Sequence, residues 1–180
     1  SSSGGGGGDT SALKMAFSYD PGSLDPDVFY DGEGQTIIEA TYEGLVQYKG
    51  DSTTTIEPQL ATSWEVSQDG LTYTFHLRTG VKFSDGTEMT SQTWKSEFER
   101  RTAMDQGSLY LTADVAEILT PDPATLVLKL SQPVSAFLHY LASPYGIKAV
   151  SPTAVTKHTV KDDHGTAWLA DNSAGTGPYV

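Results

Sequence analysis

The chain has 180 residues, no cysteine, and 23 acidic against 11 basic side chains, which gives a formal net charge of −12. This length allows one domain or a large subdomain, and the missing cysteines exclude disulfides and thiolate metal sites. The acidic balance argues against nucleic-acid binding, because a phosphate backbone requires clustered Lys and Arg, and it is typical of a solvated, secreted surface.

The N-terminal segment is low in complexity. Ser1–Gly8 contains only Ser and Gly, a composition typical of a flexible coil, and an engineered linker or a natural tether would both have it. Leu13–Ser18 is predicted as a short strand that ends before Pro21-Gly22. Residues 20–34 then indicate a loop rich in Asp, Gly and Tyr.

A short helix and a strand are predicted next. Thr36–Tyr42 has one apolar side, and Gly44 is expected to be its C-cap. Leu45–Tyr48 is predicted as a strand that ends in a turn at Gly50-Asp51.

The clearest element is a β-hairpin. Apolar and polar residues alternate between Leu71 and Arg78, so this strand is predicted to bury one face. Asp69-Gly70 supplies the positive φ that a tight hairpin turn needs. Trp64–Ser67 is therefore predicted to pair back on the strand.

Helices and strands are predicted to alternate in the second half of the chain. Thr90 is a good N-cap for a helix that runs to about Met104. Two strands follow, at Asp114–Thr120 and Thr125–Leu130. Two helices come after them, one at Val134–Ala142 and one that begins at Pro152. The sequence shows no internal repeat and no second domain.

No catalytic residue and no metal site is predicted. Glu39, Glu43 and Asp31 could be combined as general acid/base carboxylates, but no base or nucleophile has a recognisable spacing. We therefore interpret Glu39 as part of a solvated helix face and Glu43 as a neighbour of the helix C-cap. Asp162-Asp163-His164 with His158 could suggest a metal cluster. The two histidines are six residues apart, whereas helical zinc pairs sit four apart. We therefore interpret this stretch as a solvated charge run.

Six motifs carry a resemblance to a known family. Between residues 60 and 87 they are Leu60-Ala61-x-Ser63-Trp64-Glu65, Asp69-Gly70-Leu71-Thr72-Tyr73-Thr74-Phe75-x-Leu77-Arg78 and Gly80-Val81-Lys82-Phe83-x-Asp85-Gly86-Thr87. The others are Ser23-Leu24-Asp25-Pro26, Tyr42-Glu43-Gly44-Leu45 and Gly175-Thr176-Gly177-Pro178-Tyr179. In this order they resemble the peptide/nickel class of extracytoplasmic solute-binding proteins that feed ABC importers, over nearly the whole chain from about Leu13.

The sequence departs from the family after Thr90. Where the family usually has Ala-x-Asp-Val, this chain has Ser91-Gln92-Thr93-Trp94. Thr93 stands in place of an acidic residue at the third helical position, so the capping box is expected to be weaker.

The resemblance implies a mixed α/β (α+β) fold, namely part of the first lobe of a periplasmic-binding-protein-like structure with an inserted subdomain rich in β-hairpins. Residues 1–12 would be a flexible Ser/Gly tether, residues 13–45 and 175–180 the partial base of lobe I, and residues 46–174 the inserted subdomain. The second lobe would lie outside these 180 residues. The tether would follow a lipidated cysteine, so the protein is expected to be extracytoplasmic, as a cell-surface lipoprotein or in the periplasm.

The implied function is that of a bacterial binding protein and not of an enzyme. The protein would be the substrate-binding component of an ABC transporter that imports oligopeptides, dipeptides or a similar solute, with two lobes that hinge shut over it. Expected partners are a peptide or other small solute, the permease subunits, and a membrane reached through the lipid anchor; no cofactor and no nucleic acid are expected. A secreted hydrolase domain and a non-catalytic cell-surface scaffold module are the alternatives.

Candidate solute contacts are tyrosines and one loop. A peptide cleft needs apolar faces with polar tips and free backbone groups, a combination found at Tyr19, at Tyr110 and in the loop Phe29-Tyr30-Asp31-Gly32-Glu33. In the family, this loop and a residue near Tyr110 lie at the cleft. Asp31 or Glu33 could then hold a ligand ammonium group. The alternatives are that Tyr30 covers the helix Thr36–Tyr42 and that Tyr110 fills core.

Overall fold

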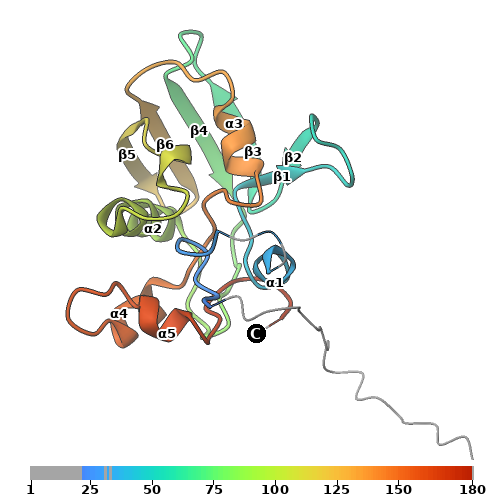
Figure 1. Ribbon diagram of the computed structural model, residues 1–180. Coiled ribbons are helices and arrows are strands. Elements are labelled where there is room, and N and C mark those ends of the chain that lie inside the picture. The colour runs from blue at the N-terminus through green and yellow to red at the C-terminus, as the bar shows by residue number, and fades with distance from the viewer. Residues whose placement is uncertain (1–21, 31, 33, 180) are drawn as a thin grey trace, which may run out of the picture.

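The computed structural model describes residues 22–30, 32 and 34–179. The predicted tether and the predicted strand Leu13–Ser18 lie outside the described residues. The described chain is a mixed α/β structure (Figure 1). Its elements are α1 (Gln35–Thr41), β1 (Val46–Tyr48), β2 (Ile56–Pro58), β3 (Ala61–Val66), β4 (Thr72–Leu77), α2 (Ser91–Met104), the 3-10 helix η1 (Leu109–Leu111), β5 (Val115–Asp122), β6 (Thr125–Leu130), α3 (Phe137–Ala142), α4 (Pro152–His158) and α5 (Thr166–Leu169).

An antiparallel four-stranded sheet in the order β3-β4-β6-β5 forms the centre of the larger part. The predicted hairpin is confirmed: Trp64 pairs with Phe75, and Gly70 in the turn has φ +69°. The alternation in β4 also holds, because Phe75 is fully buried while His76 is exposed. Alternating leucines of β6 line the same buried face.

The two outer strands of this sheet are irregular. The pairing of β3 with β4 shifts register between Ala61 and Ser63. The pairing of β5 with β6 shifts twice, between Val115 and Glu117 and between Leu119 and Asp122. β5 continues through Pro121, past the predicted strand end at Thr120, because an outer strand can hold a residue that lacks an N–H group.

The first hydrophobic core lies between this sheet, α2, α3 and β1. Trp94 and Phe98 of α2 are buried in it. Thr90 caps α2, and its N–H donates to Thr93 Oγ1 at 3.1 Å. Thr93 therefore accepts the hydrogen bond that Glu or Gln accepts in a standard capping box, and the capping box is present.

Two predicted boundaries in the helices are wrong. α1 ends at Thr41 and Tyr42 is extended, so Gly44 is not its C-cap. Instead, the Gly44 N–H donates to Gln59 Oε1 at 2.7 Å, and a Cβ at Gly44 would lie 3.2 Å from the Val46 carbonyl oxygen. α3 begins at Phe137, three residues after the predicted start at Val134.

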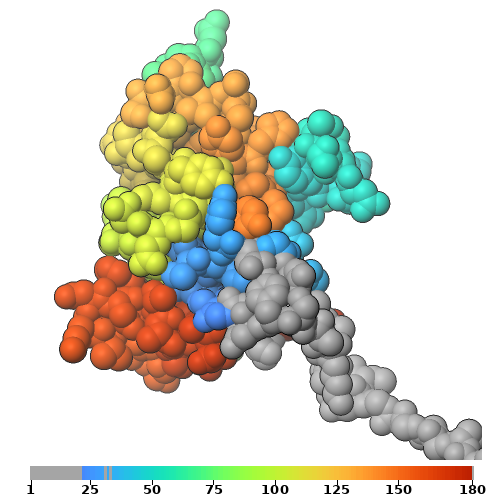
Figure 2. Space-filling view, viewed as in Figure 1, coloured from blue at the N-terminus to red at the C-terminus, as the bar shows by residue number. Residues whose placement is uncertain are grey.

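A second, smaller core joins α1 to α4 and α5. Phe29, Ile38 and Tyr42 pack there against residues from the end of the described chain, namely Val150, Ala154, Leu169 and Ala174. Figure 2 shows this late segment lying against the segment that begins at residue 22. The core thus takes residues from both sides of the predicted boundary at residue 46, and the domain division stays a prediction. Within the described ranges, no helix combines the length and apolarity of a membrane span.

Candidate functional site

Three tyrosines from distant parts of the chain meet on the surface. Tyr30 Oη and Tyr110 Oη are 3.1 Å apart and share a hydrogen bond across a separation of 80 residues. The ring of Tyr30 lies against that of Tyr145, with centroids 4.7 Å apart and an interplanar angle of 36°. Tyr30 and Tyr110 remain 56% and 57% exposed. We call Tyr30, Tyr110 and Tyr145 the tyrosine cluster.

The turn before Tyr30 sets the direction of its side chain. The N–H groups of Val28 and Phe29 both donate to the Asp25 carbonyl oxygen, at 3.1 and 2.8 Å. Phe29 is only 4% exposed and packs in the second core. Because Phe29 is anchored inward, Tyr30 is presented to solvent.

Close backbone contacts fix the other two tyrosines. Tyr110 lies in η1, which α2 reaches through Gly107, and Gly107 has φ +57°. A Cβ at Gly107 would come within 2.4 Å of the Asp27 carbonyl oxygen, so this loop lies directly on the turn that precedes Tyr30. The carbonyl oxygen of Tyr145 accepts a hydrogen bond from Arg101 Nη1 at 3.4 Å.

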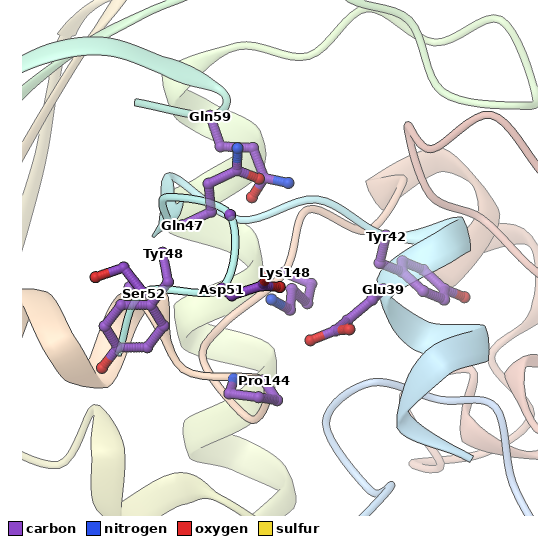
Figure 3. Close-up of a pocket in the computed structure, with 11 residues that line it drawn as sticks. Glu39, Tyr42, Gln47, Tyr48, Asp51, Ser52, Gln59, Pro144 and Lys148 are labelled. Atoms are coloured by element: carbon purple, nitrogen blue, oxygen red, sulfur yellow. The ribbon is translucent and has the colours of Figure 1, made fainter. Parts of the chain in front are cut away.

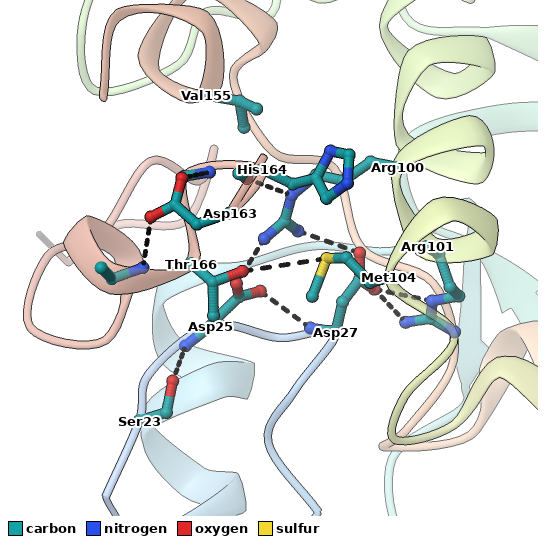
Figure 4. A network of polar contacts seen from close by, with 12 residues as sticks. Ser23, Asp25, Asp27, Arg100, Arg101, Met104, Val155, Asp163, His164 and Thr166 are labelled. Carbon is teal, nitrogen blue, oxygen red and sulfur yellow. Dashed lines mark hydrogen bonds and ion pairs between the residues drawn. The ribbon is translucent and has the colours of Figure 1, made fainter. Parts of the chain in front are cut away.

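A buried cluster of charged groups joins these segments (Figure 4). Arg100 of α2 donates to Asp25, to Asp27 Oδ2 at 3.0 Å and to Glu97 at 3.3 Å. Arg101 Nε donates to Asp27 Oδ1 at 2.6 Å. All five side chains are buried. We call Asp25, Asp27, Glu97, Arg100 and Arg101 the buried ionic cluster.

The protonation of the buried ionic cluster follows from its burial and its charges. Burial, reinforced by the negative charge of Asp27, raises the pKa of Glu97 well above its ordinary value. Burial opposes ionisation of Asp27 too, but the charges of Arg101 and Arg100 and the hydrogen bonds from Glu97 and Arg101 together outweigh it and lower the pKa of Asp27. Burial also raises the pKa of Asp25, although the positive charge of Arg100 opposes this. The ion pairs of Arg100 and Arg101 with the two aspartates join α2 to the turn that carries Asp25 and Asp27. The buried ionic cluster therefore holds α2 on the turn at residues 25–28, which positions Tyr30 and Tyr110.

The predicted solute contacts divide into three groups. Tyr30 and Tyr110 are brought together and exposed, so the alternative that Tyr110 fills core is wrong. Phe29 is a core residue, while Gly32 is exposed with no atom within 4 Å of a Cβ placed there. The predictions for three more residues lie outside the described part of the chain: Tyr19, Asp31 and Glu33.

Sequence reasoning missed two features of the site. Tyr145 was not singled out, although Ser143-Pro144-Tyr145-Gly146 has the composition of an exposed turn. The buried ionic cluster was also missed. Its signal was the set Glu97, Arg100 and Arg101 on the helix that also carries the buried Trp94 and Phe98.

Two of the remaining polar candidates, Glu43 and Asp163, make hydrogen bonds that order the chain around them. Glu43 Oε2 accepts a hydrogen bond from Thr176 Oγ1 at 2.7 Å. Asp163 accepts the N–H groups of Val160 and Gly165, at 2.8 and 3.0 Å, so it orders its own loop. Within the described ranges, no three His, Asp or Glu side chains are placed to hold a metal ion.

A comparison of this sequence with known protein families shows which family the chain belongs to. Residues 55–180 match the family described as bacterial extracellular solute-binding proteins, family 5 (middle). The chain belongs to this family. The resemblance predicted from six motifs is therefore confirmed, and so is the fold class. Members of the family bind solutes, which agrees with a chain that is not an enzyme.

Individual members of family 5 are similar along most of this chain. It is 38% identical over 171 residues to the probable D,D-dipeptide-binding periplasmic protein DdpA of Escherichia coli K12. The matched residues make up 93% of this chain and 33% of DdpA. A solved structure of AgaA from A. tumefaciens R10, in complex with agropinic acid, has a TM-score of 0.74 and 35% identity over 88% of this chain and 30% of AgaA. DppA of Helicobacter pylori, in complex with the peptide STSA, has a TM-score of 0.75 and 30% identity over 88% of this chain and 34% of DppA. The chain thus spans about a third of the length of these family members.

Proposed function

We propose that this chain is the first-lobe part of the substrate-binding component of an ABC importer, and that the tyrosine cluster forms the first lobe's side of the solute cleft. The solute is an oligopeptide, a dipeptide or a similar small molecule. The observation that carries the proposal is the exposed pair Tyr30 and Tyr110, held together by a hydrogen bond.

The chemistry of the tyrosine cluster suits a peptide. Tyrosine rings offer large apolar faces that lose little conformational entropy on binding, and their hydroxyl groups pair with backbone amides or carbonyls. The rings of Tyr30 and Tyr145 already contact each other, and the loops that carry them are tied to buried groups. A preorganised surface of this kind loses less free energy on binding than a flexible one. Asp31 and Glu33, next to Tyr30 in the sequence, would supply carboxylates for the ammonium group of a peptide.

The names of the relatives support a peptide as the first solute to test. DdpA is described as binding D,D-dipeptides, and DppA was solved with a tetrapeptide. AgaA was solved with agropinic acid, so other small solutes are also candidates.

The rest of the proposal concerns the whole protein. A second lobe would close over the solute and the closed form would be recognised by the permease. The segment Ser1–Gly8 would be the tether between the folded protein and a lipid anchor, long enough to leave the cleft free. The first lobe alone is expected to bind weakly, because half of a cleft cannot remove a solute from water.

Calorimetry of the two-lobed protein that carries this chain tests the proposal. We expect a mixed library of short peptides to contain a ligand with sub-millimolar affinity, about −4 kcal/mol or better. Tyr30→Ala is expected to weaken this binding about tenfold, because an aromatic contact contributes about 1–2 kcal/mol. Tyr179→Ala removes another exposed tyrosine, outside the tyrosine cluster, and serves as the matched control. If Tyr30→Ala and Tyr179→Ala bind equally well, the tyrosine cluster is not part of the cleft.

A further inference from the structure

A cavity lies in a part of the surface that the tyrosine cluster does not line. Its volume is about 370 Å³, and none of the three clustered tyrosines lines it. Figure 3 shows it between α1, the turn that follows β1, and the segment after α3. Its charged lining residues are Glu39, Asp51 and Lys148. Cavities of this size accept small organic molecules.

Lys148 is the unusual residue of this cavity. It is 6% exposed and lies between Ile147 and Ala149, which are both fully buried. The Ala149 N–H donates to the Glu43 carbonyl oxygen at 2.9 Å, so the backbone beside Lys148 is fixed. The Lys148 ammonium makes no hydrogen bond and no ion pair with any of the residues that the structure describes. A buried ammonium group without a partner is unfavourable unless something else compensates its charge.

Opposite charges reach the same cavity without pairing. Figure 3 shows the Glu39 side chain directed toward the cavity from α1 and the Lys148 side chain from the segment after α3. Burial lowers the pKa of Lys148 to about 8, although the negative charge of Glu39 opposes this shift. Lys148 is therefore still mostly protonated at neutral pH. Glu39 and Lys148 form no ion pair with each other or with any other described residue, so both charges are available to a ligand.

Gln59 adds a neutral hydrogen-bonding group to the lining. Its Oε1 accepts the Gly44 N–H at 2.7 Å, which fixes the amide and leaves its NH₂ group as a donor. A simple anion at Lys148 would face the carboxylates of Glu39 and Asp51, and a simple cation would face Lys148. A molecule that carries both charges avoids both repulsions.

We propose that this cavity is a second binding site, for a small zwitterion such as a free α-amino acid, with the ligand carboxylate on Lys148 and the ligand ammonium on Glu39. This inference does not depend on the proposed peptide cleft, because the two sites share no residue.

Nuclear magnetic resonance titration of the protein with three probes tests the inference. L-serine carries both charges, acetate carries only the carboxylate, and methylamine only the ammonium. We expect L-serine to shift the amide signals around Ala149, with an affinity at least about tenfold higher than that of acetate or methylamine. Equal affinity for L-serine and acetate, or no shift with L-serine at about 10 mM, would overturn the proposal.

Substitutions locate the binding. Lys148→Met keeps the length of the side chain and removes its charge, so it is expected to lower L-serine affinity at least about tenfold. Glu39→Gln, at an exposed position, is expected to lower it as well. Lys82→Met removes an exposed lysine elsewhere and is the matched control. L-serine binding that survives Lys148→Met would show that the ligand sits elsewhere. Tyr30→Ala should leave L-serine binding unchanged, which separates this site from the tyrosine cluster.

Chemical acetylation is an independent test of the location. Acetic anhydride modifies unprotonated amines, and a lysine with a lowered pKa reacts ahead of ordinary lysines where the reagent can enter. We expect L-serine to slow the acetylation of Lys148, measured by mass spectrometry, and to leave that of Lys82 unchanged. Unslowed acetylation of Lys148 at saturating L-serine would contradict the proposed contact.

Discussion

Removal of Arg100 tests whether the buried ionic cluster holds the two cores together. Arg100→Met keeps most of the volume of the side chain but leaves Asp25, Asp27 and Glu97 with one cation fewer, and it leaves the His164 carbonyl oxygen without its donor at 2.9 Å. Breaking a buried ion pair by removing one partner costs about 3–5 kcal/mol. For a domain of this size, 1 kcal/mol corresponds to about 2–4 °C in Tm, so we expect Tm to fall by about 6–20 °C.

Thermal unfolding followed by circular dichroism at neutral pH measures this effect. Arg78→Met is the control, because Arg78 is exposed and makes one hydrogen bond to the Gln59 carbonyl oxygen; its loss should cost about 1 kcal/mol or less. The deficit of Arg100→Met should shrink in acid, where the carboxylates are protonated and no longer need a cation. A Tm for Arg100→Met within about 2 °C of the control would refute the reasoning.

Three further substitutions follow from the same contacts. The pKa of Glu97 is raised in the folded state above its ordinary 4.5, so the stability that this group contributes is present below pH 4.5 and is lost as the pH rises through the folded value. Glu97→Gln should therefore flatten the fall in Tm above pH 4.5, and an unchanged pH profile would contradict the raised pKa. Gly107→Ala should lower Tm and disturb the contact between Tyr30 and Tyr110, because its Cβ would meet the Asp27 carbonyl oxygen at 2.4 Å; a Tm equal to that of the wild type would show that the loop can move away freely. Phe75→Ala, in the fully buried centre of β4, should cost about 3–5 kcal/mol in chemical denaturation, and a loss below about 1 kcal/mol would place Phe75 outside the core.

Elements with local sequence signals were predictable. The hairpin at Asp69-Gly70 and the start of α2 at Thr90 depend on turn and cap residues that act within a few positions, and both are where the sequence places them. The end of α1 was not predictable in the same way. Gly44 has the residue type of a helix cap, but it lies beyond the end of α1, and its N–H donates to Gln59, a residue of another segment.

The site was predictable in part for the same reason. Tyr30 and Tyr110 could be proposed from their residue type and from the family resemblance, but their contact depends on a separation of 80 residues. Asp25 and Arg100 look like ordinary solvated charges in the sequence, and their burial becomes visible only when residues 75 apart are brought together. Lys148 gives no local signal at all, because a lysine is almost never expected to be buried.

The irregular outer strands of the four-stranded sheet have a consequence for behaviour at high concentration. An uninterrupted outer strand would act as a template on which another molecule could add a strand of its own. Here the register shifts in β3 and β5, together with Pro121, limit any such intermolecular ladder to a few residues. The sheet should therefore resist edge-to-edge aggregation without needing a covering helix on either side.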